Sequence, residues 1–570
     1  MIKVDTNGRN MMGKLGNFLK NNRKPMSFLV LLVVITSAIT YSRIMIQIKM
    51  GPVSDSVVFL ANALTMADQG TGYSNLLFPP FFSFVVSLFF RMGYVYSSTI
   101  FYIDGAFFVV GVVGLYLLLK LKFNDIESFL GALLYATFPI VLIVLGLGLS
   151  DLPGVAITIW AFYFLLLAVE RNSRFFYLAV PLFMLAFLTR YNNALLIFPF
   201  TLYLLINRDT VNYKNLFGGI IGAFLVIVPV FVFFFQQFGN VLYPFMNFAS
   251  SSNTVSSANM NAFYNPDIYF FLEKLPSLIG NLGFIIILSS ILAVFCYILW
   301  DLTHETRLKS LKSVLSPEIQ RYKILILITV TAVFLLSIGK IQYILSELLF
   351  VLTILIFYET IKGLDIKHMK LHILFFSWFM AFFIFHSTFV LKDVRYYIVM
   401  EPPLAYFMIL GLSVISKRIK LEHRGRNYTL TILAVLISML AISSAVSQMP
   451  IILHSNQGNV LFNQELISAS NWIATNDPNY KNQEIYSDLW PNFSWDLKTN
   501  VKPVPVFKGN DSFLVGVINF SFDQADSDKF NSYLLTNNAD YYLSVRTGLN
   551  LTSYVPVKEF GDIIIYKRQN

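Results

Sequence analysis

The chain has 570 residues, of which 56% are hydrophobic and 13% are charged. The charged share is about half that of a soluble domain, which excludes an ordinary water-soluble globular protein and indicates a membrane protein. One cysteine, Cys296, excludes an intrachain disulfide and a cysteine-based metal site. The net charge of +10 does not indicate nucleic-acid binding, because residues 1–450 hold 33 of the 42 basic residues and only 20 of the 32 acidic ones.

Apolar runs long enough to cross a bilayer recur along the first 450 residues. A helix needs roughly 20 residues to cross about 30 Å of hydrocarbon. We predict thirteen transmembrane helices, over residues 27–47, 101–120, 128–149, 152–169, 175–189, 192–206, 216–236, 277–299, 324–339, 342–361, 371–390, 396–416 and 428–449.

Basic residues mark alternate loops between these spans. By the positive-inside rule such loops are cytoplasmic, which places the amino terminus inside and everything after about residue 450 outside. We therefore expect a multi-pass plasma-membrane protein. The basic loops are Arg9 to Lys24, Lys120 with Lys122, Arg171 with Arg174, Arg208 with Lys214, Arg307 to Lys323, Lys362 to Lys370 and Lys417 to Arg426.

Two long loops fall on the external side. The first covers residues 48–100, where Ser54 can cap a helix that begins at Asp55, and where residues 79–90 form an apolar run too short to cross. We interpret both segments as interfacial helices. The second loop, residues 237–276, is long enough to cover a bound ligand.

After Pro450 the composition becomes polar, which predicts two domains: a transmembrane domain over residues 1–450 and an external domain over residues 451–570. Residues 554–558 and 562–566 flank a turn and predict a hairpin. The result is a small α/β domain. Its other expected elements are helices at 463–475 and 528–536 and strands at 484–487, 503–507 and 540–545.

Ionisable residues gather at the external ends of the spans. Asp55 opens the first external loop, Asp151 lies between the third and fourth spans, Arg190 between the fifth and sixth, and Lys392-Asp393-Val394-Arg395 between the eleventh and twelfth. Charges beside a membrane are costly unless they are hydrated or paired, so they are functional candidates. Cations can hold a phosphate and stabilise it as a leaving group, while a carboxylate can accept a proton from a hydroxyl.

Among the cations, arginine binds phosphate best because its planar fork donates two hydrogen bonds at once. This favours Arg190 and Arg395 over Lys392 as primary phosphate contacts. His386, near the external end of the eleventh span, is a candidate accessory residue.

Each of these residues also has a structural alternative. Asp55 and Asp151 each suit the start of a helix. Arg190 can extend to lipid headgroups, and Arg395 with the tyrosines after it can anchor the chain at the membrane interface. His386 can be a hydrogen-bonded core residue, and Asp393 can belong to a structural ion pair.

Taken in order, these segments resemble the membrane-embedded GT-C glycosyltransferases, specifically the group of dolichyl-phosphate-mannose protein mannosyltransferases and aminoarabinose transferases (glycosyltransferase family 39-like). The resemblance covers roughly residues 27–415. The segment from Ile485 to Pro491 resembles external domains of archaeal and some bacterial members, which implies an archaeal or bacterial source. The matching pieces are Gly51-Pro52-Val53-Ser54-Asp55, Phe78-Pro79-Pro80-Phe81, Ser150-Asp151-Leu152-Pro153, Ala186-Phe187-Leu188-Thr189-Arg190-Tyr191 and Arg395-Tyr396-Tyr397 followed by Pro402-Pro403.

The resemblance implies a GT-C fold with Asp55 and Asp151 as catalytic carboxylates and with Arg190, Arg395 and Lys392 at the donor phosphate. His386, Asp393, Tyr191 and Tyr396 are accessory candidates. The resemblance assigns no cofactor, and two converging carboxylates leave a divalent metal open. Many relatives carry Glu after the first Asp, whereas Ser56 stands here.

The expected function is transfer of a single hexose or pentose from a polyprenyl or dolichyl phosphate to a hydroxyl of protein, glycan or lipid. The segment Ser494-Trp495-Asp496-Leu497 departs from the Trp-Trp-Asp-Tyr-Gly element of oligosaccharyltransferases, which disfavours transfer of a whole oligosaccharide. A transporter or flippase is the main alternative, although such proteins place their binding groups near the bilayer midplane. A non-catalytic assembly protein is the third.

Overall fold

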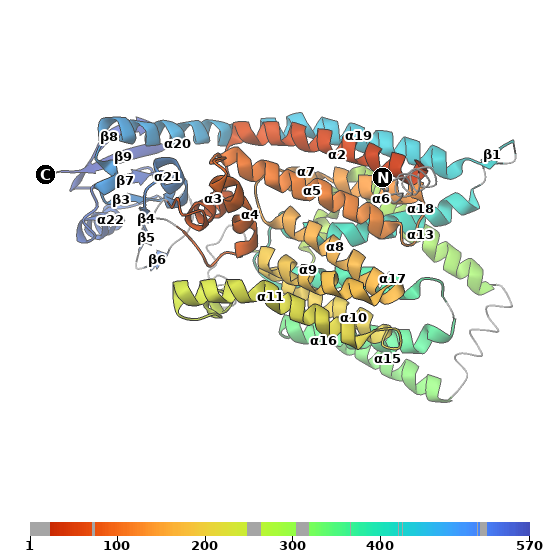
Figure 1. The fold of residues 1–570 in the computed structure, drawn as a ribbon. Helices are drawn as coiled ribbons and strands as arrows, with labels where there is room; N and C mark the ends of the chain where they lie inside the picture. Colours follow the sequence, from red (N-terminus) through yellow and green to blue (C-terminus); the bar gives the residue numbers. More distant parts are fainter. Residues whose placement is uncertain are drawn as a thin grey trace, which may run out of the picture.

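The computed structural model consists of a helical bundle with a small sheet-containing unit at one end (Figure 1). It describes residues 23–70, 74–247, 264–303, 318–364, 366–419, 421–424, 426–509, 511–513 and 521–569. The basic amino-terminal segment up to residue 22, residues 307–317 of one predicted cytoplasmic loop and residues 248–263 of the second external loop lie outside the described residues.

Helices that run side by side form the bundle (Figure 1). Within the described ranges, ten are long and apolar enough to cross a membrane, so the polytopic class is confirmed while the count of thirteen is not. Short 3-10 helices η1 (Ser173–Phe175), η2 (Tyr191–Leu196), η3 (Lys362–Leu364) and η4 (Val394–Met400) connect some of them. The α-helices are α2 (Arg23–Met50), α5 (Ser97–Leu119), α6 (Asp125–Thr137), α7 (Pro139–Val144), α8 (Asp151–Glu170), α9 (Phe176–Thr189), α10 (Ile197–Ile206), α11 (Tyr213–Phe238), α13 (Phe270–Thr303), α15 (Glu318–Ser337), α16 (Tyr343–Ile361), α17 (Met369–Thr388), α18 (Glu401–Arg418) and α19 (Thr429–Ser455).

The third predicted span, residues 128–149, is not one continuous helix. Phe138 is extended, with φ −61° and ψ 136°, because the following Pro139 disfavours helical geometry at the residue before it. The short helix α7 ends at Val144, and positive φ angles of 75° at Gly146 and 74° at Gly148 turn the chain toward α8. The third span therefore ends in a loop that leads directly to Asp151.

The first external loop contains α3 (Ser54–Met66) and α4 (Pro80–Arg91), as two short helices were predicted. The predicted cap is wrong, since α3 begins at Ser54 and its N-cap is Val53, without a side-chain hydrogen bond. The rings of Phe59 and Phe82 pack edge to face with centroids 5.5 Å apart, so the two helices form one unit. This unit lies between the bundle and the sheet (Figure 1).

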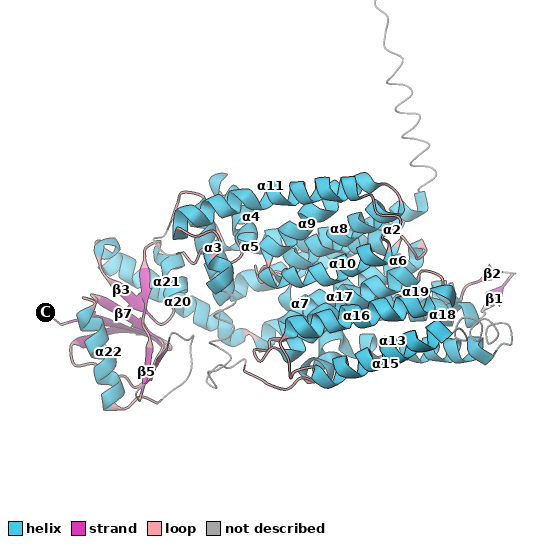
Figure 2. Cartoon of the chain, turned by 90° about the horizontal axis from the view of Figure 1, so that it is seen from below, coloured by secondary structure: helices cyan, strands magenta, loops and turns pink. Residues whose placement is uncertain are grey.

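The carboxy-terminal unit contains a five-stranded sheet of order β4-β3-β7-β9-β8, which lies at one end of the molecule (Figure 2). β3 is parallel to β4 and β7, whereas β9 is antiparallel to β7 and β8. The predicted hairpin is thereby confirmed, while the predicted strand 503–507 is divided in two. The elements are α20 (Gln457–Asn476), η5 (Tyr480–Asn482), β3 (Ile485–Ser487), α21 (Trp490–Leu497), β4 (Val501–Pro503), β5 (Val506–Lys508), β6 (Asp511–Phe513), α22 (Gln524–Thr536), β7 (Tyr541–Ser544), β8 (Tyr554–Phe560) and β9 (Ile563–Arg568).

Two smaller pairings complete the strands: β5 with β6, and β1 (Glu422–His423) with β2 (Arg426–Asn427) in the loop before α19. α19 continues through Pro450 to Ser455, and α20 follows almost at once. The predicted boundary between two domains at residue 450 stays a prediction, because the helix does not end there.

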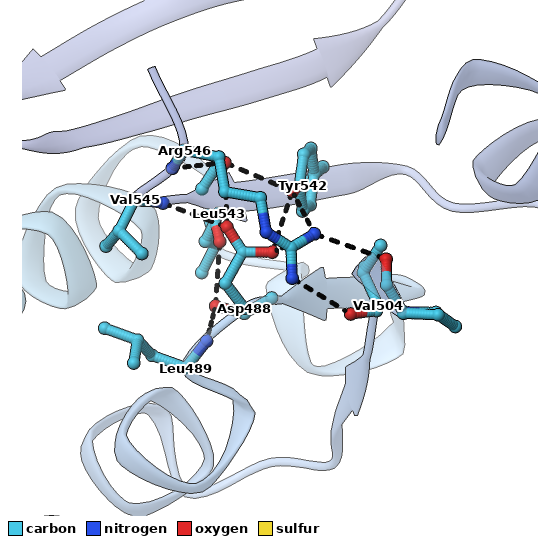
Figure 3. Close-up of polar contacts among 10 residues, drawn as sticks. Asp488, Leu489, Val504, Tyr542, Leu543, Val545 and Arg546 are labelled. Atoms are coloured by element: carbon cyan, nitrogen blue, oxygen red, sulfur yellow. Dashed lines mark hydrogen bonds and ion pairs between the residues drawn. The ribbon is translucent and has the colours of Figure 1, made fainter. Parts of the chain in front are cut away.

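A buried ion pair ties β3 to the end of β7 in this unit (Figure 3). Asp488 Oδ1 lies 2.8 Å from Arg546 Nη1 and accepts a 2.8 Å hydrogen bond from Tyr542 Oη. Asp488 Oδ2 accepts from Ser544 Oγ at 2.8 Å and from the Val545 amide at 3.1 Å. Burial raises the pKa of Asp488, and Arg546 and these hydrogen bonds oppose the rise.

Replacing Arg546 by Met should destabilise the carboxy-terminal unit, because it leaves the Asp488 carboxylate buried without its cation. Loss of one partner of a buried pair costs about 3–5 kcal/mol. Thermal unfolding and limited proteolysis of the full-length protein in detergent measure the effect. Lys481→Met, at an exposed position, is the matched control, and equal unfolding temperatures for the two variants would contradict the prediction.

Candidate active site

Arg395 joins two carboxylates that lie far apart in the sequence. Its Nη1 lies 2.8 Å from Asp55 Oδ2, and its Nε lies 2.9 Å from Asp393 Oδ2. Asp393 is the N-cap of η4 and also accepts a 3.0 Å hydrogen bond from the Arg395 amide, which orients both side chains. The first external loop and the loop after α17 therefore meet at one guanidinium.

A second ion pair lies beside the first. Arg190 Nη1 pairs with Asp151 Oδ1, which joins the end of α9 to the first residue of α8. The guanidinium carbons of Arg190 and Arg395 lie 5.4 and 5.8 Å from the centroid of the Tyr396 ring. One aromatic ring thus contacts both cations, and the predicted residues Asp55, Asp151, Arg190, Arg395, Asp393 and Tyr396 come together in one place.

The exposure of these side chains changes across the site. Asp151 is 5% exposed and Arg190 is 15% exposed, whereas Arg395 is 26% and Asp55 is 34% exposed. Electrostatic interactions are stronger at the buried side, where water is excluded. Of these four groups, the Asp55 carboxylate is therefore the most accessible to solvent.

Buried polar residues that were not predicted as part of the site hold the loop before Asp151. Asp104 Oδ2 accepts a 3.2 Å hydrogen bond from the Gly148 amide. Arg43 donates from Nε to the Leu142 carbonyl at 3.0 Å and from Nη2 to the Ile143 carbonyl at 3.1 Å. A lone charged residue inside an apolar span was the signal that could have identified both as positioning residues.

Lys392 does not face the ion pairs as predicted. Its Nζ donates to the carbonyls of His386 at 3.1 Å, Ser387 at 2.7 Å and Phe389 at 3.0 Å, so the ammonium caps the carboxyl end of α17. Burial lowers the pKa of Lys392 to about 8, and Asp267 opposes this. A direct contact between Lys392 and a donor phosphate is not supported by this geometry.

The two remaining accessory candidates pack in the aromatic wall of the site. The ring of His386 stacks on Tyr396, with centroids 5.1 Å apart, and is buried. Tyr191, which follows Arg190, packs edge to face against Phe245 at 5.2 Å. His386 thus supports Tyr396 from the side of α17, and Tyr191 contacts the segment after α11.

The second external loop returns beside the site. Tyr264 forms an isolated antiparallel bridge with Leu391, and the Asn265 amide donates to the Val390 carbonyl at 2.7 Å. The end of this loop therefore runs along the segment that leads into Lys392 and Arg395. Covering of a bound ligand by the loop stays a prediction.

The carboxy-terminal unit reaches the same region through α21, a helix that was not predicted. Trp495 is 7% exposed and stacks on Phe90 of α4, with centroids 6.1 Å apart. Lys498 Nζ lies 3.2 Å from the centroid of the Trp495 ring. Because α4 packs on α3, the contact between α21 and α4 also links α21 to the helix that carries Asp55.

Asp496 of α21 should make stability depend on pH. Burial raises its pKa to about 6, while Lys498 opposes the rise. The folded state then binds more protons than the unfolded state between about pH 4 and pH 6, so the contribution of Asp496 to stability falls as pH rises through this window. At pH 7.5, Asp496→Asn should therefore unfold at a higher temperature than the unmodified protein.

Thermal unfolding at pH 7.5 and at pH 4 measures this difference, which should disappear at pH 4. The control is Asp562→Asn, at an exposed position, which should show no such change with pH. An Asp496→Asn variant that is destabilised at pH 7.5 would contradict the prediction.

Within the described ranges, no group of three or more His, Cys, Asp or Glu side chains is arranged to hold a metal ion. The carboxylates of the site instead have guanidinium partners. The divalent metal that the sequence allows stays a prediction.

Comparison with known proteins gives the same fold. Residues 78–233 match the family model described as dolichyl-phosphate-mannose-protein mannosyltransferase. ArnT from Cupriavidus metallidurans bound to undecaprenyl phosphate is 12% identical, with a TM-score of 0.56, 95% of this chain covered and 98% of that chain. Its apo structure has 11% identity, a TM-score of 0.58 and the same coverage of 95% and 98%.

The Archaeoglobus fulgidus oligosaccharyltransferase, in complex with Zn and sulfate, is 14% identical with a TM-score of 0.44, over 90% of this chain and 67% of that chain. No match was found among curated protein sequences. The ArnT structures, which align over nearly the whole of both chains, establish the fold. The chain therefore has the GT-C fold of membrane glycosyltransferases, with a segment over residues 78–233 that matches the mannosyltransferase family.

Proposed function

We propose that the chain is a membrane glycosyltransferase that moves one sugar from a polyprenyl phosphate to a hydroxyl of a protein, glycan or lipid. The observation that carries the proposal is the position of Arg395 between Asp55 and Asp393, with the Arg190 guanidinium also beside the Tyr396 ring. Two cations beside a partly exposed carboxylate provide the groups that displacement of a lipid phosphate needs. The fold shared with an ArnT bound to undecaprenyl phosphate supports this donor class.

In the proposed reaction, the donor phosphate binds between Arg395 and Arg190. Each guanidinium already has a carboxylate partner, so the phosphate has to share these cations with Asp55, Asp393 and Asp151. When the Arg395 guanidinium donates a hydrogen bond to the phosphate, the ion pair between Arg395 and Asp55 weakens. Donor binding would thereby make Asp55 available to the acceptor.

Asp55 then takes the proton of the acceptor hydroxyl while the hydroxyl oxygen bonds to the anomeric carbon. The bond between this carbon and the phosphate oxygen breaks, and the electron pair leaves with the polyprenyl phosphate, whose charge the two arginines stabilise. A single displacement of this kind inverts the anomeric configuration. Asp151 keeps Arg190 in place from the buried side.

The location of the charges favours an enzyme over a transporter or flippase. Transporters bind cargo near the bilayer midplane, often at broken helices related by internal repeats. Here Asp55, Asp151 and Arg190 lie at the ends of α3, α8 and α9, and Arg395 lies in η4 and pairs with Asp55. The helix α3, which carries Asp55, lies at the end of the bundle next to the sheet (Figure 1). Movement of a lipid-linked sugar without any chemistry would support the transporter instead.

Asp55→Asn should lower sugar transfer by about 10²–10⁴-fold, the usual contribution of a general base. Purified protein in liposomes, supplied with a panel of labelled polyprenyl-phosphate hexoses and pentoses, provides the assay for transfer and donor hydrolysis. Asp68→Asn is the matched control because Asp68 lies just after α3 and its side chain is 90% exposed. Turnover retained in Asp55→Asn would remove Asp55 from the mechanism.

Arg395→Ala should weaken donor binding by roughly 10–100-fold, the range expected when a hydrogen bond to a charged group is lost. Titration of the full-length protein with undecaprenyl phosphate measures the affinity. Arg395→Lys keeps the charge but cannot donate two hydrogen bonds in one plane, so its affinity for undecaprenyl phosphate should lie between that of Arg395→Ala and that of the unmodified protein. The control Arg91→Ala removes an exposed arginine of α4, and an equal loss of affinity there would contradict a specific role for Arg395.

A further inference from the structure

A second polar cluster lies at the opposite end of α17 from the candidate active site. Lys122 Nζ lies 3.1 Å from Tyr406 Oη and 3.2 Å from His372 Nε2, and Tyr406 Oη lies 2.8 Å from His372 Nδ1. Lys122 also lies 5.0 Å from the ring centroids of both Phe123 and Tyr406. Because His372 lies 16 residues before the end of α17 at Thr388, the cluster is roughly 24 Å from that end along the helix axis.

The cluster carries more positive charge than its carboxylates balance. Burial, Lys417 and Lys367 lower the pKa of Lys122 to about 7, and Glu127 opposes them. Glu127 Oε2 already accepts a 3.1 Å hydrogen bond from the Asn124 amide at the start of α6. Among the residues that the structure describes, Lys367 and Lys417 form no ion pair with an acidic side chain. An anion placed among these lysines would relieve their repulsion.

An apolar cavity adjoins this cluster. Its volume is about 460 Å³, and it lies between α15, α16, α17 and α18. Leu327, Ile354, Phe357, Met369 and Phe407 line it, together with His372. His372 therefore faces both the lysine cluster and the cavity, so the two features form one continuous surface.

We propose that this surface binds an anionic phospholipid, with its phosphate at Lys122, Lys367 and Lys417 and one acyl chain in the cavity. A soluble phosphate would leave the cavity unfilled. A lipid can place its phosphate at the lysines and its acyl chain in the cavity. Basic pockets between transmembrane helices are typical sites for anionic headgroups. The lipid is not the sugar donor, because it lies at the other end of the bundle from Asp55.

Native mass spectrometry of the full-length protein in phosphatidylcholine nanodiscs, titrated with dioleoylphosphatidylglycerol, tests this proposal. The double variant Lys122→Gln and Lys417→Gln should bind this lipid roughly 25-fold more weakly, since each lysine near a membrane surface contributes about fivefold. A double variant of two exposed cations at the same end, Arg174→Gln and Lys214→Gln, is the charge-matched control and should retain the affinity. Equal affinities for the two double variants would overturn the proposal.

Two further arms separate a lipid site from a simple phosphate site. Thr331→Phe fills the cavity without changing the charge and should weaken the lipid while thermal unfolding of the protein stays the same. Glycerol 3-phosphate alone should show no saturable binding at concentrations that saturate the lipid. Undiminished lipid binding in Thr331→Phe, or headgroup binding as tight as that of the lipid, would overturn the assignment of the cavity. The Arg395 and Asp55 variants should leave this lipid affinity unchanged, so the two proposals fail independently.

Discussion

The bidentate position of Arg395 between Asp55 and Asp393 is the constraint on which the active-site end depends. A guanidinium or a carboxylate next to a bilayer is costly alone, and each becomes tolerable when it meets its counterion. The ion pairs therefore determine the positions of three segments: the first external loop, the turn before α8 and the segment after α17. The same pairs leave the charges available to a phosphate, because exchange of one anion for another keeps each arginine neutralised.

Around these ion pairs, other charged residues bind backbone groups and thereby hold the neighbouring loops in place. Arg43 and Asp104 fix the carbonyls and amides of the loop that precedes Asp151, and Lys392 closes the end of α17. α21 packs on α4 through Trp495, so a packing contact joins the carboxy-terminal unit to the helix pair that carries Asp55. These residues are not members of the ion pairs, but each holds a segment that carries or adjoins a charged side chain of the site.

The two ends of the bundle use charge in different ways. At the active-site end, each arginine has a carboxylate within ion-pair distance, and the side chains become less buried toward Asp55. At the other end, Lys367 and Lys417 repel the Lys122 ammonium, which lies beside an apolar cavity. In the two proposals, the paired charges exchange one anion for another during turnover, whereas the unbalanced charges hold one anion continuously.

The sequence by itself determined the class of the protein and pointed to most of the charged residues that meet at the candidate site. Apolar runs of bilayer length require helices, since the backbone has to satisfy its own hydrogen bonds in lipid, and the charges between them can lie only at the membrane faces. Asp55, Asp151, Arg190 and Arg395 were identified on this basis, together with most elements of the carboxy-terminal sheet. Hydropathy could not predict the break at Phe138, where a local proline effect outweighed the apolar run.

Only the tertiary structure decided which charges meet. Lys392 and Arg395 are three residues apart, and both were predicted at the donor phosphate, with Arg395 favoured; in the fold, Lys392 caps a helix and Arg395 pairs with Asp55. The docking of Trp495 and the link between Lys122 and His372 join residues hundreds of positions apart. Such contacts depend on the direction of each side chain in the folded chain, a property that residue type and spacing along the sequence do not carry.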